Sequence, residues 1–383
     1  MSDPFCIDWF GGPSAQLEIF SAQTAQYQLK YTPAFRTTIR PPLVPLSLGT
    51  ADLLPINAEL DRVAQGTSAA RHGGNPAAIP PAADLAASLQ LAGEQLFELV
   101  LPRYIQLDLR GRELALEIGV DERILQYPWE LLHDGTEYLC LRHCVGRFVN
   151  SERAAIPRFE EPWGGSLKPA RVLVISVPRP QWLDGTKFES LPEAEAETDA
   201  IVDALGKIDG VEVELLSGAQ ATFNAVFKTL KAKAFHIVHF NGHAVFDANA
   251  PKQSSLVLHD RGMSPAQIVK FFGKYPPILC FINACETAVM PGWQGAHDIF
   301  GIAQAFLETD SYLLGTRWKL NDQVASAFAG AFYRSLLVDQ KPLGSAIAES
   351  RRVARAAKPD DLGWASYIYY GDPRLWFHRR PDV

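Results

Sequence analysis

The chain contains 383 residues, 47% of them hydrophobic, which is enough to form one large or two ordinary domains with real cores. Its net charge of −7 at pH 7 and the lack of a long cluster of Lys and Arg argue against nucleic acid as a partner. No apolar run approaches the ~20 residues needed to span a bilayer, so no membrane partner is expected.

The expected compartment is the cytoplasm. Residues 1–4 (MSDP) contain neither the basic n-region nor the apolar h-region of a secretory leader. The five cysteines are odd in number and lack the spacing of a disulfide framework, so they fit reduced thiols. At least one of them is then available for chemistry.

The N-terminal part is predicted to form a half-exposed antiparallel sheet followed by a helix. Residues 16–20 and 25–31 have the alternating character that is typical of such a sheet. Residues 66–83 are small, polar and rich in proline, and they predict a mobile surface loop. From Asp84 to Pro102 the apolar side chains recur at intervals of three and four residues, which predicts a helix with one apolar face.

Cys140, His143 and Cys144 raise the alternative of a metal site. They follow a predicted strand at residues 112–119 and a predicted short helix at residues 127–132, which is entered through a proline. Structural zinc takes four ligands, and no second pair of cysteines or histidines stands at zinc-site distance. We therefore expect thiols on a strand, and neither a metal nor a cofactor.

The second half of the chain has the sequence pattern of an α/β domain. Residues 151–168, rich in Glu, Pro and Gly, predict a linker between an N-terminal α+β region, residues 1–165, and residues 166–383. From Ala170 onward strands and helices alternate, which predicts a parallel sheet. The first helix opens at residues 192–197 with an acidic turn that suits the positive end of its dipole. Neither a G-x-G-x-x-G nor a Walker-type loop occurs, so the hypothesis of a nucleotide-binding module is poorly supported.

Two strands of this predicted sheet end in a reactive residue. Residues 235–243 end at His243, and residues 277–285 end at Cys285. Each is an apolar run that stops at a turn-forming or small polar residue, as central strands of a parallel sheet do when both faces are covered. Chemistry collects at the carboxyl ends of strands in open α/β sheets, so we expect His243 and Cys285 to face each other there.

Five sequence blocks carry a resemblance to a known family. Residues 241–244 (NGHA), 282–287 (INACET), 314–318 (LGTRW) and 369–373 (YYGDP) resemble, in that order, the signature blocks of the CHAT domain. CHAT proteases are caspase-like cysteine peptidases, related to separase, gingipains and caspases. Residues 127–132 (YPWELL) resemble a block that often precedes the catalytic part.

The resemblance extends over residues 90 to about 377 and implies a fold. It implies a caspase-like α/β/α sandwich with a mainly parallel central sheet, formed by residues 166–383 as the catalytic domain. A smaller α+β region, residues 1–165, precedes it as a pseudo-caspase or regulatory part.

The resemblance also implies a dyad, with Cys285 as the nucleophile and His243 as its partner. A free thiol is only a few per cent thiolate at neutral pH, and a neighbouring imidazole raises its reactivity. The backbone N–H groups of Gly242 and Cys285 are implied as the oxyanion hole, and glycine at 242 allows an unusual backbone angle and close approach of a substrate. Cys280, inside its strand, is expected to be an inert core thiol. His239 is expected to pack in the core, with orientation of His243 as the alternative.

Substrate preference is indicated weakly, by residues around the implied pocket. Asp322 resembles in placement an acidic S1 residue of separase-like enzymes, and Trp318 would form a wall of the pocket. An acid at the base of the pocket favours a basic P1 residue. Two readings oppose this: Asp322 caps a helix that begins after it, or Arg317 lines the pocket and suits an acidic P1. Asn283, two residues before the cysteine, departs from the acid that metacaspases have there. The balance slightly favours basic P1.

The leading hypothesis is a cytosolic, bacterial cysteine endopeptidase that acts on a protein substrate. The family implies limited proteolysis in regulation, defence or programmed cell death, with a protein partner that activates it. The alternative is a catalytically inactive module of the same fold that binds a peptide or partner protein. No internal repeat of ~34 residues is visible, so a sensing part would be residues 1–165 or a separate protein.

Overall fold

The computed structural model describes most of the chain, and two predicted connections fall outside the described part. The linker at residues 151–168 lies outside it, as does most of the predicted loop at residues 66–83, whose last residues already belong to the following helix. The described residues are 5–9, 11–23, 26–34, 43–47, 54–56, 58–60, 62–63, 66, 80–110, 112–121, 124, 127–150, 169–182, 184–188, 190–245, 254–273, 275–286, 302, 305–306, 308–309, 311–318 and 320–379.

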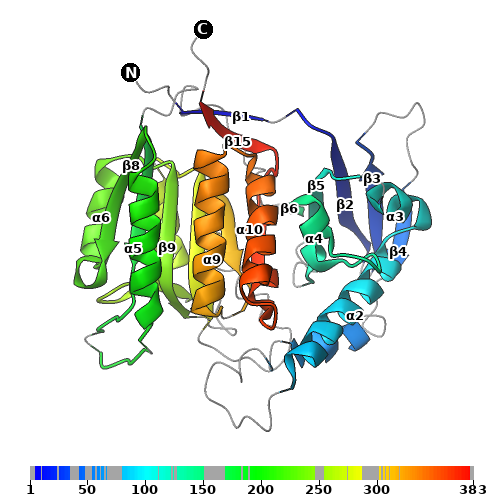
Figure 1. The fold of residues 1–383 in the computed structure, drawn as a ribbon, viewed down its shortest axis with the longest axis horizontal. Coiled ribbons are helices and arrows are strands. Elements are labelled where there is room, and N and C mark those ends of the chain that lie inside the picture. Colours follow the sequence, from blue (N-terminus) through cyan, green and yellow to red (C-terminus); the bar gives the residue numbers. More distant parts are fainter. Residues whose placement is uncertain are drawn as a thin grey trace.

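One large sheet runs through both halves of the protein (Figure 1). Most neighbouring strands in it are parallel, and the antiparallel pairs are β13·β14, β2·β3, β3·β4, β9·β10 and β10·β11. In spatial order the strands are β8 (Val211–Ser217), β7 (Ala170–Ser176), β9 (Ile237–Val245), β12 (Leu279–Glu286), β13 (Tyr312–Thr316), β14 (Tyr367–Tyr370), β6 (Cys144–Asn150), β5 (Ala115–Asp121), β2 (Ser14–Gln23), β3 (Gln26–Thr32) and β4 (Val44–Ser47), with β10 (Ser255–Val257) and β11 (Gly262–Met263).

Helices cover both faces of the C-terminal half. The chain passes from β7 to β8 in one direction and returns to β9 in the other, so right-handed crossovers place α5 and α6 on opposite faces. α9 packs against both α5 and α10, and these three helices stand together in front of the strands in Figure 1. α6 and α7 pack on each other. The bounds are α5 (Pro192–Gly206), α6 (Phe223–Ala232), α7 (Pro265–Phe272), α9 (Asp322–Tyr333), its π-helical extension η7 (Arg334–Val338) and α10 (Leu343–Ala357), with η4 (Gly218–Gln220) and η8 (Leu362–Ala365) as short 3-10 turns.

The N-terminal half follows the predicted pattern with local differences. β2 and β3 are antiparallel, and β2 alternates buried and half-buried residues as expected, although its other edge is parallel to β5. Cys140 lies in a short helix and only Cys144 begins a strand, so the prediction of strand thiols was wrong for Cys140. The remaining elements are α2 (Ala82–Val100), α3 (Arg103–Arg110), η3 (Trp129–Leu131) and α4 (Leu139–Arg142).

The two ends of the described chain pair with each other. β1 (Phe5–Trp9) is antiparallel to β15 (Leu375–Arg379), and the two form a separate small sheet at the top of Figure 1. This pairing fastens the start of the N-terminal half to the end of the C-terminal half. Across the parts of the chain that are described, no helix is both long enough and apolar enough to cross a bilayer.

The half-sheets meet at a single backbone pair within the described strands. Tyr370 of β14 pairs with Arg147 of β6, and the N–H of Gly371 donates to the carbonyl of Arg147 at 3.0 Å. Gly146 is required at this joint, because a Cβ there would lie 2.1 Å from the carbonyl oxygen of Gly371. Tyr370 and Gly371 of the YYGDP block thus lie at the joint between the half-sheets.

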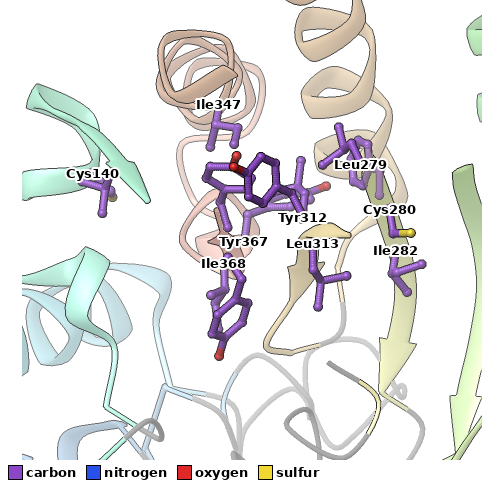
Figure 2. Packing of buried hydrophobic residues seen from close by; sticks show 14 of the residues in the cluster. Cys140, Leu279, Cys280, Ile282, Tyr312, Leu313, Ile347, Tyr367 and Ile368 are labelled. Carbon is purple, nitrogen blue, oxygen red and sulfur yellow. The ribbon is translucent and has the colours of Figure 1, made fainter. Parts of the chain in front are cut away.

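The hydrophobic core extends through the C-terminal half and across the joint. Figure 2 shows side chains of α10, β12, β13 and β14 gathered together, with Cys140 of the N-terminal half on the far side of β14. α9 presents an apolar stripe to this core, since Val324, Phe328 and Phe332 are fully buried. Phe328 and Phe332 contact the ring of Phe281 in β12, at centroid distances of 6.0 and 5.3 Å. This contact fixes the middle of β12 against α9.

His236, just before β9, is a buried histidine that must be neutral to keep its hydrogen bond. The backbone N–H of Arg171 donates to its Nδ1 at 2.8 Å. Burial, with a smaller contribution from the Arg171 charge, lowers the pKa of His236 to about 4. An unfolded histidine titrates near 6.5, so the stability from neutral His236 is complete above that pH and is lost as pH falls toward 4.

We predict that His236→Asn weakens the acid sensitivity of the fold. The amide oxygen of asparagine can accept the same N–H without titrating. Between pH 7 and pH 5 the loss in free energy of unfolding should be smaller than in the wild type by about 2 kcal/mol. Urea unfolding at pH 7, 6 and 5 measures this, and an unchanged pH dependence would contradict it.

Candidate active site

The two reactive residues are neighbours at the carboxyl ends of adjoining parallel strands. The register of β12 on β9 pairs Ala284 with Gly242 and Cys285 with His243. Parallel strands need a long crossover connection, here the residues between Val245 and Leu279, but the ladder between the two strands fixes the relative position of the two residues. The expected meeting of the two strand ends is therefore present in the backbone.

His243 is fully buried, and an aromatic cover lies over it. The ring of Phe188 lies 5.6 Å from the imidazole, at an interplanar angle of 31°. Phe188 in turn packs edge-on against Trp182, whose Nε1 donates to the carbonyl of Leu258 at 3.0 Å. Sequence reasoning missed both aromatic residues, because they stand in the connection after β7 and carry no periodic signal.

Gly242 is explained by space and not by backbone conformation. β9 continues through this residue without a positive φ, so the expected unusual backbone angle is absent. A Cβ at Gly242 would lie 3.2 Å from Cζ of Phe240 and 3.4 Å from Cβ of Val177, which is a tight fit. A larger residue would press on the strand that carries His243.

A row of polar side chains crosses three strands just before the reactive pair. Ser176, Asn241 and Asn283 are paired in register on β7, β9 and β12. α5 covers this row: Thr198 donates from Oγ1 to Oγ of Ser176 at 2.8 Å, and Asn241 Nδ2 lies 3.4 Å from Thr198 Oγ1. Asn283 Nδ2 donates to Glu197 Oε1 at 2.9 Å. The same helix therefore binds all three strands.

The sequence places Glu197 in the acidic opening turn of a helix, and in the structure, where α5 begins at Pro192, Glu197 lies just beyond the first turn of that helix. Its side chain points inward and the residue is only 4% exposed. A signal was present, since Glu197 stands three residues after Ala194 and four before Ile201, both of which are buried. A carboxylate at such a position needs a partner, which Asn283 provides.

His239 packs in the core, as expected. It is fully buried, and its Nδ1 lies 3.0 Å from the hydroxyl of Tyr333. Its ring contacts Phe281 at a centroid distance of 4.6 Å. Burial lowers the pKa of His239 to about 3, so the imidazole is neutral at physiological pH.

Three cysteines have described side chains, and all three lie in the interior. Cys140, Cys144 and Cys280 are free and buried. Burial raises the pKa of Cys140 to about 11 and that of Cys280 still higher, so both stay protonated. The prediction for Cys280 is confirmed. Within the described ranges, no group of three or more His, Cys, Asp or Glu residues is arranged to hold a metal ion.

Trp318 and Asp322 lie beyond the end of β13, at the same end of the sheet. The backbone N–H of Trp318 and its carbonyl both bond to the hydroxyl of Ser366, and the residue is buried. Asp322 is the first residue of α9, but the cap is Asn321, whose Oδ1 accepts from the N–H of Gln323 at 3.0 Å. The reading of Asp322 as the helix cap was therefore wrong.

Arg317 is buried against the joint between the half-sheets. Its Nη2 lies 3.4 Å from the carbonyl oxygen of Tyr127. Arg147 donates to the same carbonyl at 3.1 Å and to Oε2 of Glu130 at 2.5 Å, and its guanidinium lies 5.6 Å from the ring centre of Tyr370. The YPWELL block thus binds two buried arginines, one from each half of the sheet, a contact that no spacing rule predicts.

Comparisons with known proteins show the family and the fold. The sequence matches the CHAT domain family over residues 90–376, more than half of the chain. A chain of the Saccharomyces cerevisiae separase–securin complex aligns with 94% of the protein at a TM-score of 0.54 and 11% identity, and the protein spans 30% of that chain. The predicted caspase-like α/β/α sandwich is confirmed.

Two further solved structures align less closely. A second structure of the Saccharomyces cerevisiae separase–securin complex has a TM-score of 0.46 at 11% identity, over 94% of the protein and 30% of that chain. Gingipain R, an Arg-specific cysteine proteinase, has a TM-score of 0.47 at 12% identity, over 77% of the protein and 69% of its own chain. A search of curated proteins found no match.

The buried ion pair at the joint makes a stability prediction. Glu130→Gln leaves the guanidinium of Arg147 buried without its counter-charge, so the free energy of unfolding should fall by roughly 3–5 kcal/mol. Glu137→Gln is a matched control, because the pair of Glu137 with Arg355 is exposed and should change stability by roughly 0–1 kcal/mol. Chemical denaturation measures both, and equal losses would contradict the assignment.

Proposed function

The protein belongs to the CHAT domain family, and from this we propose that it is a cysteine endopeptidase that carries out limited proteolysis through Cys285 and His243. The observation that carries the proposal is the pairing of these two residues in the β9·β12 ladder. In this mechanism His243 takes the thiol proton of Cys285 and the thiolate attacks the scissile carbonyl carbon.

The remaining steps follow ordinary acyl transfer. The imidazolium of His243 returns its proton to the leaving amine as the C–N bond breaks, and water then hydrolyses the thioester of Cys285. The backbone N–H groups of Gly242 and Cys285 are our candidates for the oxyanion hole. The burial of His243 under Phe188 supports the proposed role of His243, because electrostatic interactions are stronger where water is excluded.

For specificity we propose a pocket with Trp318 as a wall and Asp322 as its charged residue. The contact of Arg317 with the Tyr127 carbonyl supports Asp322 as the charged residue of the pocket. The guanidinium of Arg317, which would otherwise favour an acidic P1 residue, is engaged by that carbonyl. A basic P1 side chain then suits the pocket through a charge-assisted contact. Asn283 was the fourth residue assigned to the pocket, and its bond to Glu197 supports a role beneath the site instead.

The proposed setting is regulated proteolysis in the cytoplasm of a bacterium, in defence or cell death. A separase chain solved with securin is one fold relative, and this supports control by a protein partner here too. The second candidate function is an inactive caspase-like module that binds a peptide or partner protein. The observation that favours this second function is the burial of the His243 imidazole, over which the ring of Phe188 lies.

We predict that a thiol-reactive peptidyl probe labels the wild type at Cys285 and not Cys285→Ala. His243→Ala should react at least about 100-fold more slowly, because general-base assistance contributes typically 10²–10⁴-fold. Intact mass and peptide mapping measure the labelling. Cys280→Ala is the matched control and should label like the wild type, since its thiol is buried and protonated. Equal labelling of the wild type and His243→Ala would refute the dyad.

A separate prediction concerns the pocket. In a peptide-library cleavage profile the wild type should prefer Arg or Lys at P1, and Asp322→Ala should lose this preference by about tenfold or more in kcat/KM, as expected for a charge-assisted hydrogen bond of about 1.5–3 kcal/mol. Asp360→Ala removes an exposed acid and serves as the control. A basic preference that survives in Asp322→Ala would refute the assignment.

A further inference from the structure

Two buried residues beneath the proposed site have contacts that packing alone does not explain. Glu197 of α5 accepts a hydrogen bond at 2.9 Å from Asn283 of β12, and both residues are 4% exposed. We propose that Glu197 and Asn283 are positioning residues that hold the carboxyl end of β12, and with it Cys285, in register with His243. This proposal rests on the proposed function.

Burying the carboxylate of Glu197 beside Asn283 is energetically unfavourable in itself. A buried carboxylate loses its hydration and must be compensated by hydrogen bonds or charges, whereas leucine at the same place would fill the space without that cost. The position therefore favours a role in which a fixed polar contact matters. A hydrogen bond to a carboxylate is also stronger and more directional than a neutral one.

The position of the pair in the sheet also favours a positioning role. Asn283 stands two positions before Cys285, and its strand partner Asn241 stands two positions before His243. Both asparagines bind α5, Asn283 through Glu197 at 2.9 Å and Asn241 through Thr198 at 3.4 Å. One helix thus holds both strands in the same row. The shorter bond is made to β12, the strand that carries the nucleophile.

The polar contact between Tyr333 and His239 lies near Glu197. Burial first, and then the charge of Glu197, raise the pKa of the Tyr333 hydroxyl, so the carboxylate lies near that group. Tyr333 in turn meets Nδ1 of His239 at 3.0 Å. The carboxylate of Glu197, which accepts from Asn283 of β12, therefore lies near the polar contact that joins α9 to β9.

The test compares Glu197→Gln with Glu197→Leu. Glutamine keeps an oxygen that can accept from Asn283, so kcat should stay within about threefold of the wild type. Leucine removes the acceptor, and a displaced nucleophile should lower kcat by about 10- to 100-fold with KM within about twofold. Rates are expressed per active site after titration with the peptidyl probe. Asn283→Leu should match Glu197→Leu, and the double variant should lose no more than either.

The control is Thr309→Val, which also removes a buried hydrogen-bonding group, here a hydroxyl that donates to the carbonyl of Phe306 away from the site. Its kcat should be that of the wild type. If Glu197→Leu lowers only the melting temperature and keeps kcat, the pair is structural and the proposal is wrong. If Glu197→Gln falls as far as Glu197→Leu, the accepted hydrogen bond is not what matters, and the proposal is also wrong.

Failure of the proposed function gives a different result. The rate of alkylation of Cys285 by iodoacetamide, located by peptide mapping, requires no peptide cleavage. A rate that is unchanged in His243→Ala overturns the dyad and with it this proposal. A rate that falls in His243→Ala but is unchanged in Glu197→Leu overturns the positioning role alone. The expected result is a fall in both and recovery in Glu197→Gln.

Discussion

The ladder between β9 and β12 is the constraint on which the candidate site depends, because it sets Cys285 beside His243. Both strands lie in the middle of the parallel sheet, where helices cover the two faces. β12 is held at its centre by Phe281, which packs against the aromatic side chains of α9, and at its end by Asn283, which binds α5. The reactive end of the strand therefore depends on two helices that come from distant parts of the chain.

The joint between the half-sheets extends this dependence to the N-terminal half. Tyr127 accepts from Arg147 of β6 and lies within hydrogen-bond reach of Arg317, which follows β13. Glu130 neutralises Arg147 there. A change in the N-terminal half at this carbonyl would act on residue 317 and on the segment that leads to Asp322. The division of the sequence at about residue 165 thus does not divide the sheet, which passes from β14 to β6 without a break.

Sequence reasoning identified the central strands β9 and β12, the order of the blocks and the apolar face of α2, because each leaves a local pattern in one segment. It assigned Arg317 to the pocket and Glu197 to an acidic first turn, because the distant partner of a buried charged residue leaves no local pattern. The partners are the Tyr127 carbonyl and Asn283, which lie 190 and 86 residues away along the chain. Phe188 was missed for a related reason, since its contact with His243 depends on how the connection after β7 folds back.

The row of Ser176, Asn241 and Asn283 also determines the register of the central strands, which apolar packing alone does not determine. A strand with one buried face has its register fixed by the hydrophobic pattern, since a slip of one residue turns that face to water. β9 is buried on both faces along nearly all its length, so a slip there would still bury apolar side chains. A slip of β9 would, however, separate Asn241 from Thr198, and a slip of β12 would separate Asn283 from Glu197 and leave a carboxylate buried without its amide. The cost of that loss selects one register, and it is the register that pairs Cys285 with His243.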